Sequence, residues 1–137
     1  MLSHVTVGVS ELERSGRFYD AVLSPMGWVR RAVKPDGGPP SLCWHDPVTD
    51  FPRFFAYMPF DGAPCSAGNG SMTAFLAPSQ EAVVAAYEAG LKAGGTDDGA
   101  PGLRLNYGPT YFGAYLRDPD GNKVHLVHRA DVTLRRG

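Results

Sequence analysis

The sequence predicts an α+β fold made of two tandem βαβββ modules, and the main observation behind this prediction is an internal repeat. Residues 4–28 align with residues 72–96, at an offset of 72 − 4 = 68 positions, so that Tyr19 falls on Tyr87. Each copy begins with a strand-like alternation, continues with helical spacing and ends at glycine. Two copies of so long a period indicate a duplicated module, because a solenoid needs about three or more repeats.

Chain length sets the expected domain organisation. With 137 residues, we expect a single domain in which module one covers about residues 1–60 and module two about residues 70–129, followed by a loose tail at residues 130–137. Half a chain of this size would be marginally stable alone, so the modules are expected to share a core. Each strand set would curl into half a barrel with its helix outside, and the inner faces would enclose a cleft.

Module one opens with a predicted strand, because valines at positions 5, 7 and 9 alternate with polar or small residues. Ser10 and Glu13 match a capping box at the start of a helix that runs to about Ser24. Three further strands are predicted at Trp28–Val33, Ser41–His45 and Pro52–Met58, with turn residues between them.

Module two repeats this order. A predicted strand at Met72–Ala77 precedes a helix that Ser79 caps and that ends at residues 94–95, two glycines. The buried stripe of this helix is predicted to hold Val83, Val84, Tyr87 and Leu91. Strands follow at Leu103–Tyr107, Tyr111–Arg117 and Lys123–His128, and residues 118–121, Asp-Pro-Asp-Gly, form a hairpin turn between the last two.

Composition excludes several classes of function. Thirteen basic and fourteen acidic residues leave a net charge of −1, which gives no basis for nucleic-acid binding. We expect no membrane partner, because no apolar run is long enough to span a bilayer. The N-terminus has no signal-peptide pattern, and Cys43 and Cys65 fit no metal or redox spacing, so we expect a cytoplasmic protein with free thiols.

The element order resembles the vicinal oxygen chelate superfamily, the group of glyoxalases, bleomycin-resistance proteins and extradiol dioxygenases. Two stretches carry the resemblance: HVTVGVSELERSGRFYDAVLSPMGW at the start and RDPDGNKVHLV near the end. It covers the chain up to about Arg129 and implies a glyoxalase-like pair of curled-sheet half-barrels. This fold carries lyases, isomerases, dioxygenases and metal-free binding proteins, so it does not by itself decide the chemistry.

The resemblance also implies where a metal would bind. Metal-using members take four ligands from the first and last strands of the two modules, and in glyoxalase-like members these are typically His or Gln and Glu. The matching positions here are His4, Met72, His125 and, by the same offset, Tyr57. A thioether is a soft ligand and a Tyr hydroxyl a poor substitute for a carboxylate. The metal candidates are therefore His4 and His125, with either no cofactor or a weakly held divalent metal (Zn, Ni, Fe or Mn).

The same residues have a second interpretation. His4 and His125 can be polar residues that line a cleft without a metal, and His125 and Tyr57 are the candidates for an acid/base group. An aromatic set can line a pocket for a planar ligand, or can belong to the core or a dimer interface. The predicted pocket-lining residues are Met72, Tyr57, Phe55, Tyr107, Tyr111 and Tyr115.

These observations favour a small-molecule-binding protein with a degenerate metal site, which sequesters or detoxifies a small, partly aromatic compound. The alternative is a metal-dependent glyoxalase-type lyase or isomerase, in which the metal acts on substrate oxygens and a Glu moves the proton. An extradiol dioxygenase fits less well, because no Asp or Glu completes a 2-His-1-carboxylate triad. A metal-free enzyme that uses His125 or Tyr57 stays open. A homodimer is expected, because paired curled sheets leave edges to be covered.

Overall fold

The computed structural model describes residues 1–132 and contains two modules with the same order of elements. Module one consists of β1 (His4–Gly8), α1 (Leu12–Leu23), a short 3-10 helix η1 (Ser24–Met26), β2 (Val29–Arg31), β3 (Ser41–His45) and β4 (Arg53–Tyr57). Module two consists of β5 (Thr73–Leu76), α2 (Gln80–Lys92), β6 (Thr96–Leu103), β7 (Phe112–Arg117) and β8 (Lys123–His128). The predicted α+β class and the two-module order are confirmed. Most of the predicted tail, residues 133–137, lies outside the described residues.

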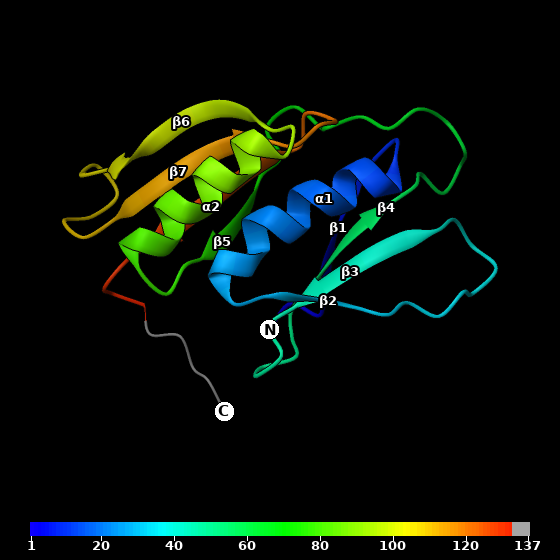
Figure 1. Ribbon diagram of the computed structural model, residues 1–137, viewed down its shortest axis with the longest axis horizontal. Coiled ribbons are helices and arrows are strands. Elements are labelled where there is room, and N and C mark those ends of the chain that lie inside the picture. The colour runs from blue at the N-terminus through cyan, green and yellow to red at the C-terminus, as the bar shows by residue number, and fades with distance from the viewer. Residues whose placement is uncertain (133–137) are drawn as a thin grey trace.

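Each module forms its own four-stranded sheet, and the two sheets have equivalent topologies. The strand orders are β1-β4-β3-β2 and β5-β8-β7-β6, with β1 parallel to β4, β5 parallel to β8, and the other neighbours antiparallel. Figure 1 shows α1 and α2 side by side, with β1 and β5 behind them. The two sheets are not closed into a barrel, so one chain presents two sheet faces that its helices do not cover.

The two helices pack against each other at Gly90. A Cβ atom at this position would lie 2.6 Å from Leu116 Cδ1 and 2.9 Å from Val22 Cγ2. Such distances are shorter than a carbon–carbon contact allows, so only glycine lets α1, α2 and β7 approach this closely.

The turn between β7 and β8 joins the two modules. Asn122 Nδ2 donates to the Gly8 carbonyl at 2.9 Å, and the buried Tyr19 hydroxyl donates to Asp118 Oδ2 at 2.7 Å. Ser10 Oγ donates to Asp120. The hairpin turn predicted at residues 118–121 is confirmed, since the Gly121 N–H donates to the Asp118 carbonyl at 2.9 Å between antiparallel β7 and β8. Its side chains also bind module one.

Three details of the sequence prediction are wrong. Ser10 does not cap α1, since the N-cap residue is Glu11, without a side-chain capping bond, and Ser10 binds Asp120 instead. The strand predicted at Leu103–Tyr107 lies earlier, at Thr96–Leu103, because bulges let its Asp- and Gly-rich segment pair with β7.

The third correction concerns the inner side of α2. The buried residues of α2 are Ala82, Val83, Ala86 and Gly90, whereas Leu91 is 38% exposed. The buried side of this helix is made mostly of small residues, and at Gly90 the lack of a side chain permits the close approach to Val22 of α1. The N-cap prediction for this helix is confirmed, since Ser79 Oγ accepts a hydrogen bond from the Ala82 N–H at 3.0 Å.

Candidate functional site

The candidate site residues lie on the sheet faces that the helices leave uncovered, here called the open faces. Alternation along β1 and β4 places Val5 and Phe54 in the core, and Thr6 and Phe55 on the opposite side. On the second sheet, Leu126 is in the core, and its neighbour His125 is on the opposite side.

The strand pairing corrects which residue of module one is equivalent to His125 of module two. Thr6 pairs with Phe55 in module one, and Ala74 pairs with His125 in module two. Phe55, and not Tyr57, therefore occupies the position equivalent to His125. The offset is two residues larger in the last strands than in the first, which preserves the side on which a residue lies.

His125 is buried and both of its ring nitrogens are occupied. Its side chain is 1% exposed, with Nδ1 2.9 Å from the Ala114 carbonyl oxygen and Nε2 2.7 Å from the Tyr111 hydroxyl. A carbonyl oxygen can only accept, so Nδ1 carries the proton and Nε2 accepts from Tyr111. The ring stacks on Tyr115, with centroids 4.0 Å apart and planes 7° from parallel.

A glycine makes room for this imidazole. A Cβ atom at Gly113 would lie 2.6 Å from His125 Cε1, so a larger residue would displace the ring. Burial lowers the pKa of His125 below its ordinary value of 6.5, and the positive charges of Arg104 and Lys123 lower it further. The imidazole is therefore neutral at pH 7.

Cations surround the aromatic residues of this open face. The Arg104 guanidinium lies 5.7 Å from the Tyr115 ring centroid, Lys123 Nζ lies 5.0 Å from the same centroid, and the Arg129 guanidinium lies 5.0 Å from the Tyr111 centroid. The last two cations are paired, Lys123 with Asp98 and Arg129 with Asp131.

Arg104 differs from these cations. Its two Nη atoms donate to the carbonyl oxygens of Gly102 at 3.0 Å and Ala100 at 2.7 Å, and it has no carboxylate partner among residues 1–132. The backbone thus holds a guanidinium with uncompensated charge beside Tyr115. Arg104 is not among the sequence candidates, because its two carbonyl partners and its place beside Tyr115 depend on the tertiary structure.

The open face of module one has a different character. His4 is exposed, with Nδ1 3.0 Å from Ser3 Oγ and its ring 5.6 Å from the Phe55 ring in an edge-on arrangement. Tyr57 lines two open pockets of about 560 and 550 Å³, and both also include Phe60, which is 83% exposed. Phe60 is not recognisable from the sequence, because a single apolar residue in a loop gives no periodic signal.

The remaining pocket candidates lie near these faces. Tyr107 is exposed, and its ring lies 5.3 Å from the Tyr111 ring. Met72 is exposed and immediately precedes β5. No hydrogen bond or ring contact joins His4 to His125 within the described residues.

The donor set does not fit the metal site that the resemblance implies. Residues 1–132 contain no group of three or more His, Cys, Asp or Glu side chains that could hold a metal ion. Of the four positions equivalent to ligands, Phe55 offers no donor atom, Met72 offers a thioether, and the two nitrogens of His125 are occupied. An octahedral divalent metal needs several hard oxygen or imidazole donors, and of these four positions only His4 supplies an imidazole that is not engaged at both nitrogens.

A comparison with models of protein families relates this chain to one superfamily. The model for the Glyoxalase/Bleomycin resistance protein/Dioxygenase superfamily matches residues 1–126. The chain belongs to this superfamily. The superfamily includes enzymes and binding proteins on one fold, so membership alone does not supply an activity.

Solved structures of superfamily proteins are similar over most of the chain. A glyoxalase/bleomycin resistance protein from Albidiferax ferrireducens T118 is 39% identical, covers 94% of this chain and 98% of its own, and gives a TM-score of 0.80. A glyoxalase-related enzyme from Fulvimarina pelagi is 19% identical, with coverages of 98% and 96% and a TM-score of 0.70. No match was found among curated proteins.

A mutant of glyoxalase I from Zea mays shares the fold at 23% identity and a TM-score of 0.67, and the match covers 95% of this chain and 46% of that protein. At this identity the likeness concerns the fold alone. Within residues 1–132, no helix has the length and apolar character needed to cross a membrane.

Proposed function

We propose that this superfamily member binds a small, partly aromatic molecule on its open faces without using a metal. The observation that carries the proposal is the state of His125, whose ring nitrogens bind Tyr111 and Ala114 and whose ring stacks on Tyr115. A metal could reach the imidazole only after this arrangement is broken, at the cost of unpaired buried polar groups. Binding without turnover is the simplest function that such a rigid face supports.

The chemistry of the open face of module two indicates an anionic aromatic ligand. Tyr107, Tyr111 and Tyr115 offer ring surface, and Arg104 offers a guanidinium without a carboxylate partner in the described part of the chain. Arginine binds carboxylates through two parallel N–H donors, and aromatic rings stack on phenol faces. A planar molecule with one carboxylate would satisfy both groups.

We also propose that two copies of the chain form a homodimer. Within one chain the two sheets are not closed into a barrel, so neither open face covers the other. A second copy could place its module two over the pockets beside Tyr57 and Phe60, and would shield a ligand from water. Light scattering at micromolar concentration should then give twice the chain mass of 14.7 kDa, and the mass of a single chain would contradict the assembly.

Calorimetric titration of the chelator-treated protein tests the proposed function. The two probes are 1-naphthoate, an aromatic carboxylate, and 1-naphthamide, its neutral counterpart. Naphthoate should bind without added metal and more tightly than the amide. Arg104→Met should weaken naphthoate binding at least about tenfold, the scale of one charge-assisted hydrogen bond.

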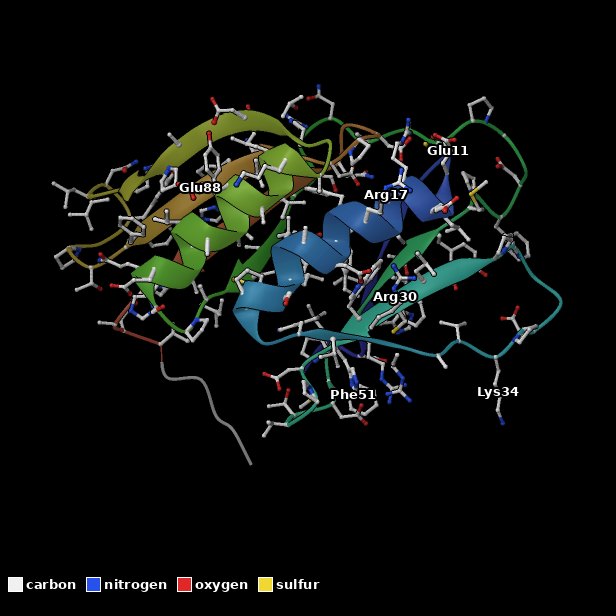
Figure 2. The ribbon with its side chains drawn as sticks, in the orientation of Figure 1. Glu11, Arg17, Arg30, Lys34, Phe51 and Glu88 are labelled. Carbon is white, nitrogen blue, oxygen red and sulfur yellow. The ribbon has the colours of Figure 1, made fainter. Side chains whose placement is uncertain are left out.

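Lys34→Met is the matched control, because it also removes one positive charge and Lys34 projects from the surface of module one (Figure 2). This variant should bind naphthoate as the parent does. Binding that requires Zn²⁺, Ni²⁺, Fe²⁺ or Mn²⁺, and that is lost in His4→Ala, would instead support the metal-dependent lyase or isomerase.

A further inference from the structure

The seam between the two modules is closed at one end and hollow at the other. Within residues 1–132, β1 pairs only with β4 and β5 pairs only with β8, so the two first strands meet at the seam without a shared ladder. At one end of the seam, the β7–β8 turn fills the gap, with Asn122 bound to the Gly8 carbonyl and Asp118 bound to Tyr19.

The equivalent connection in module one, residues 46–52 between β3 and β4, does not form such a bridge. Its Asp50 side chain binds Arg31, His45 and Arg53, which all belong to module one. Figure 2 shows Phe51 of this connection well away from Glu11, the N-cap residue of α1, which is near the closed end. The β3–β4 connection therefore does not fill its end of the seam in the way that the β7–β8 turn fills the other end.

A cavity of about 290 Å³ occupies this space. Its apolar lining includes Val5, Trp28, Phe51, Phe54 and Phe75. The Trp28 and Phe54 rings both meet the Phe75 ring edge-on, with centroids 5.4 and 5.2 Å away. Walls of this kind suit an aromatic or alicyclic body, and the volume is near the lower end for ligand pockets, about 300 Å³.

The charged groups in the wall decide the charge of the occupant. The lining contains one cation, Arg53, and one anion, the buried Asp46. Arg53 is already paired with Asp50 at 3.1 Å, and its guanidinium lies 4.3 Å from the Phe51 ring centroid. Asp46 Oδ1 already accepts a hydrogen bond from the Val48 N–H at 2.8 Å. Both charged groups of the wall are therefore engaged, and burying an added charge of either sign in this mostly apolar space is costly.

We propose that this seam cavity is a second binding site, for a small neutral molecule with one or two rings. It differs from the open-face site because Val5 and Phe54 line it, whereas their sequence neighbours Thr6 and Phe55 are on the opposite face of the sheet. The occupant would join module one to module two at the end where no turn does so.

Nuclear magnetic resonance of the full chain with indole as the neutral probe tests this site. Indole should shift the amide signals of Val5, Trp28 and Phe75. The anion indole-3-acetate and the cation tryptamine should bind at this site at least about tenfold more weakly, because each would bury an unpaired charge. Equal binding of the three probes would overturn the neutral ligand class, and an absence of indole shifts at these residues would overturn the site.

Two blocking variants and one control separate this site from the open face. Thr49 and Thr73 line the cavity, and Thr73 is on the same side of β5 as Phe75, so Thr49→Trp and Thr73→Trp should each fill the cavity. Both should abolish the indole shifts, with folding checked by thermal melting. Thr6→Trp fills the open-face pocket instead and should leave indole binding intact. Indole binding that survives both blocking variants, or that is lost only in Thr6→Trp, would contradict the proposal.

Discussion

At the scale of single residues, His125 illustrates how neighbours determine the chemistry of an imidazole. Tyr111 donates to Nε2, Ala114 accepts from Nδ1, and the Tyr115 ring covers one face. These contacts favour the neutral ring, because a protonated imidazole would have to donate to Tyr111 and remain charged in a buried position. His125 is therefore a rigid part of the open face.

The lowered pKa of His125 predicts a pH dependence of stability. Because burial depresses the folded-state pKa below 6.5, the unfolded chain binds more protons than the folded chain once the pH falls below this value. The stability that neutral His125 contributes is complete above pH 6.5 and decreases as the pH falls toward the folded pKa. Urea unfolding at pH 7 and pH 5 should show this decrease, and His125→Leu should show less of it.

The control for this prediction is His128→Leu, which replaces the other histidine of β8. This variant should keep the pH dependence of the parent. An equal pH dependence in the parent and in His125→Leu would contradict the assignment of a depressed pKa to His125.

The sequence was sufficient to place His125 on the last strand, but not to define its chemical state. Lys123–His128 is predicted and observed with the same bounds, so the alternation of the strand was readable. The partners Tyr111 and Ala114 depend on the pairing of β7 with β8, which the pattern of one strand does not contain. Phe60 and Arg104 lie in or beside loops, where no periodicity marks a functional residue.

At the scale of elements, the contact between α1 and α2 depends on the absence of a side chain at Gly90. In an exposed helix, glycine to alanine would stabilise by about 1 kcal/mol. Here Gly90→Ala would place its Cβ 2.6 Å from Leu116 and 2.9 Å from Val22, and we expect a net loss of about 1–2 kcal/mol from overpacking. Chemical denaturation measures this change, and a higher stability would contradict the close packing.

A control for helix propensity comes from the same helix. Ala85 is exposed, so Ala85→Gly should lower the free energy of unfolding by about 1 kcal/mol through propensity alone. The two substitutions are chemically opposite, yet both are expected to destabilise the protein.

The β7–β8 turn is expected to contribute to stability through its bonds to module one. Asn122 Nδ2 donates to the Gly8 carbonyl and to Asp118 Oδ2, each at 2.9 Å. Asn122→Ala removes both bonds, and Asp118 Oδ2 keeps only the Tyr19 hydroxyl as a side-chain donor, so the free energy of unfolding should fall by about 1–3 kcal/mol. Asn69→Ala, in an exposed loop, is the control, and equal effects of the two substitutions would contradict the bridging role.

Elements with a strong local pattern were predicted well, and elements that depend on distant partners were not. Ser41–His45 is observed as predicted, since its composition suits a strand. The strand β6 was misplaced, because residues 96–103 contain aspartates, glycines and a proline that disfavour a strand locally. Pairing with β7 overrides that preference. Ser10 was assigned to a capping box because its partner Asp120 is remote in sequence.

At the scale of the whole molecule, the internal repeat predicts the topology, and the differences between the modules predict where ligands bind. The open face of module one contains pockets beside Tyr57, and that of module two contains the stacked rings with Arg104. The seam is bridged at one end and hollow at the other. The internal repeat reveals the topology that the two modules share, whereas the proposed sites depend on loops that differ between the modules.

The central claim is that His125 is part of a neutral, metal-independent binding face. The most direct test is nitrogen-15 magnetic resonance of the His125 ring at pH 7, before and after addition of one equivalent of Zn²⁺. We expect a neutral ring protonated at Nδ1, with an Nε2 signal that Zn²⁺ leaves unchanged, because Tyr111 occupies that nitrogen. A stoichiometric shift of the Nε2 signal on addition of Zn²⁺ would contradict the claim and make His125 a metal ligand.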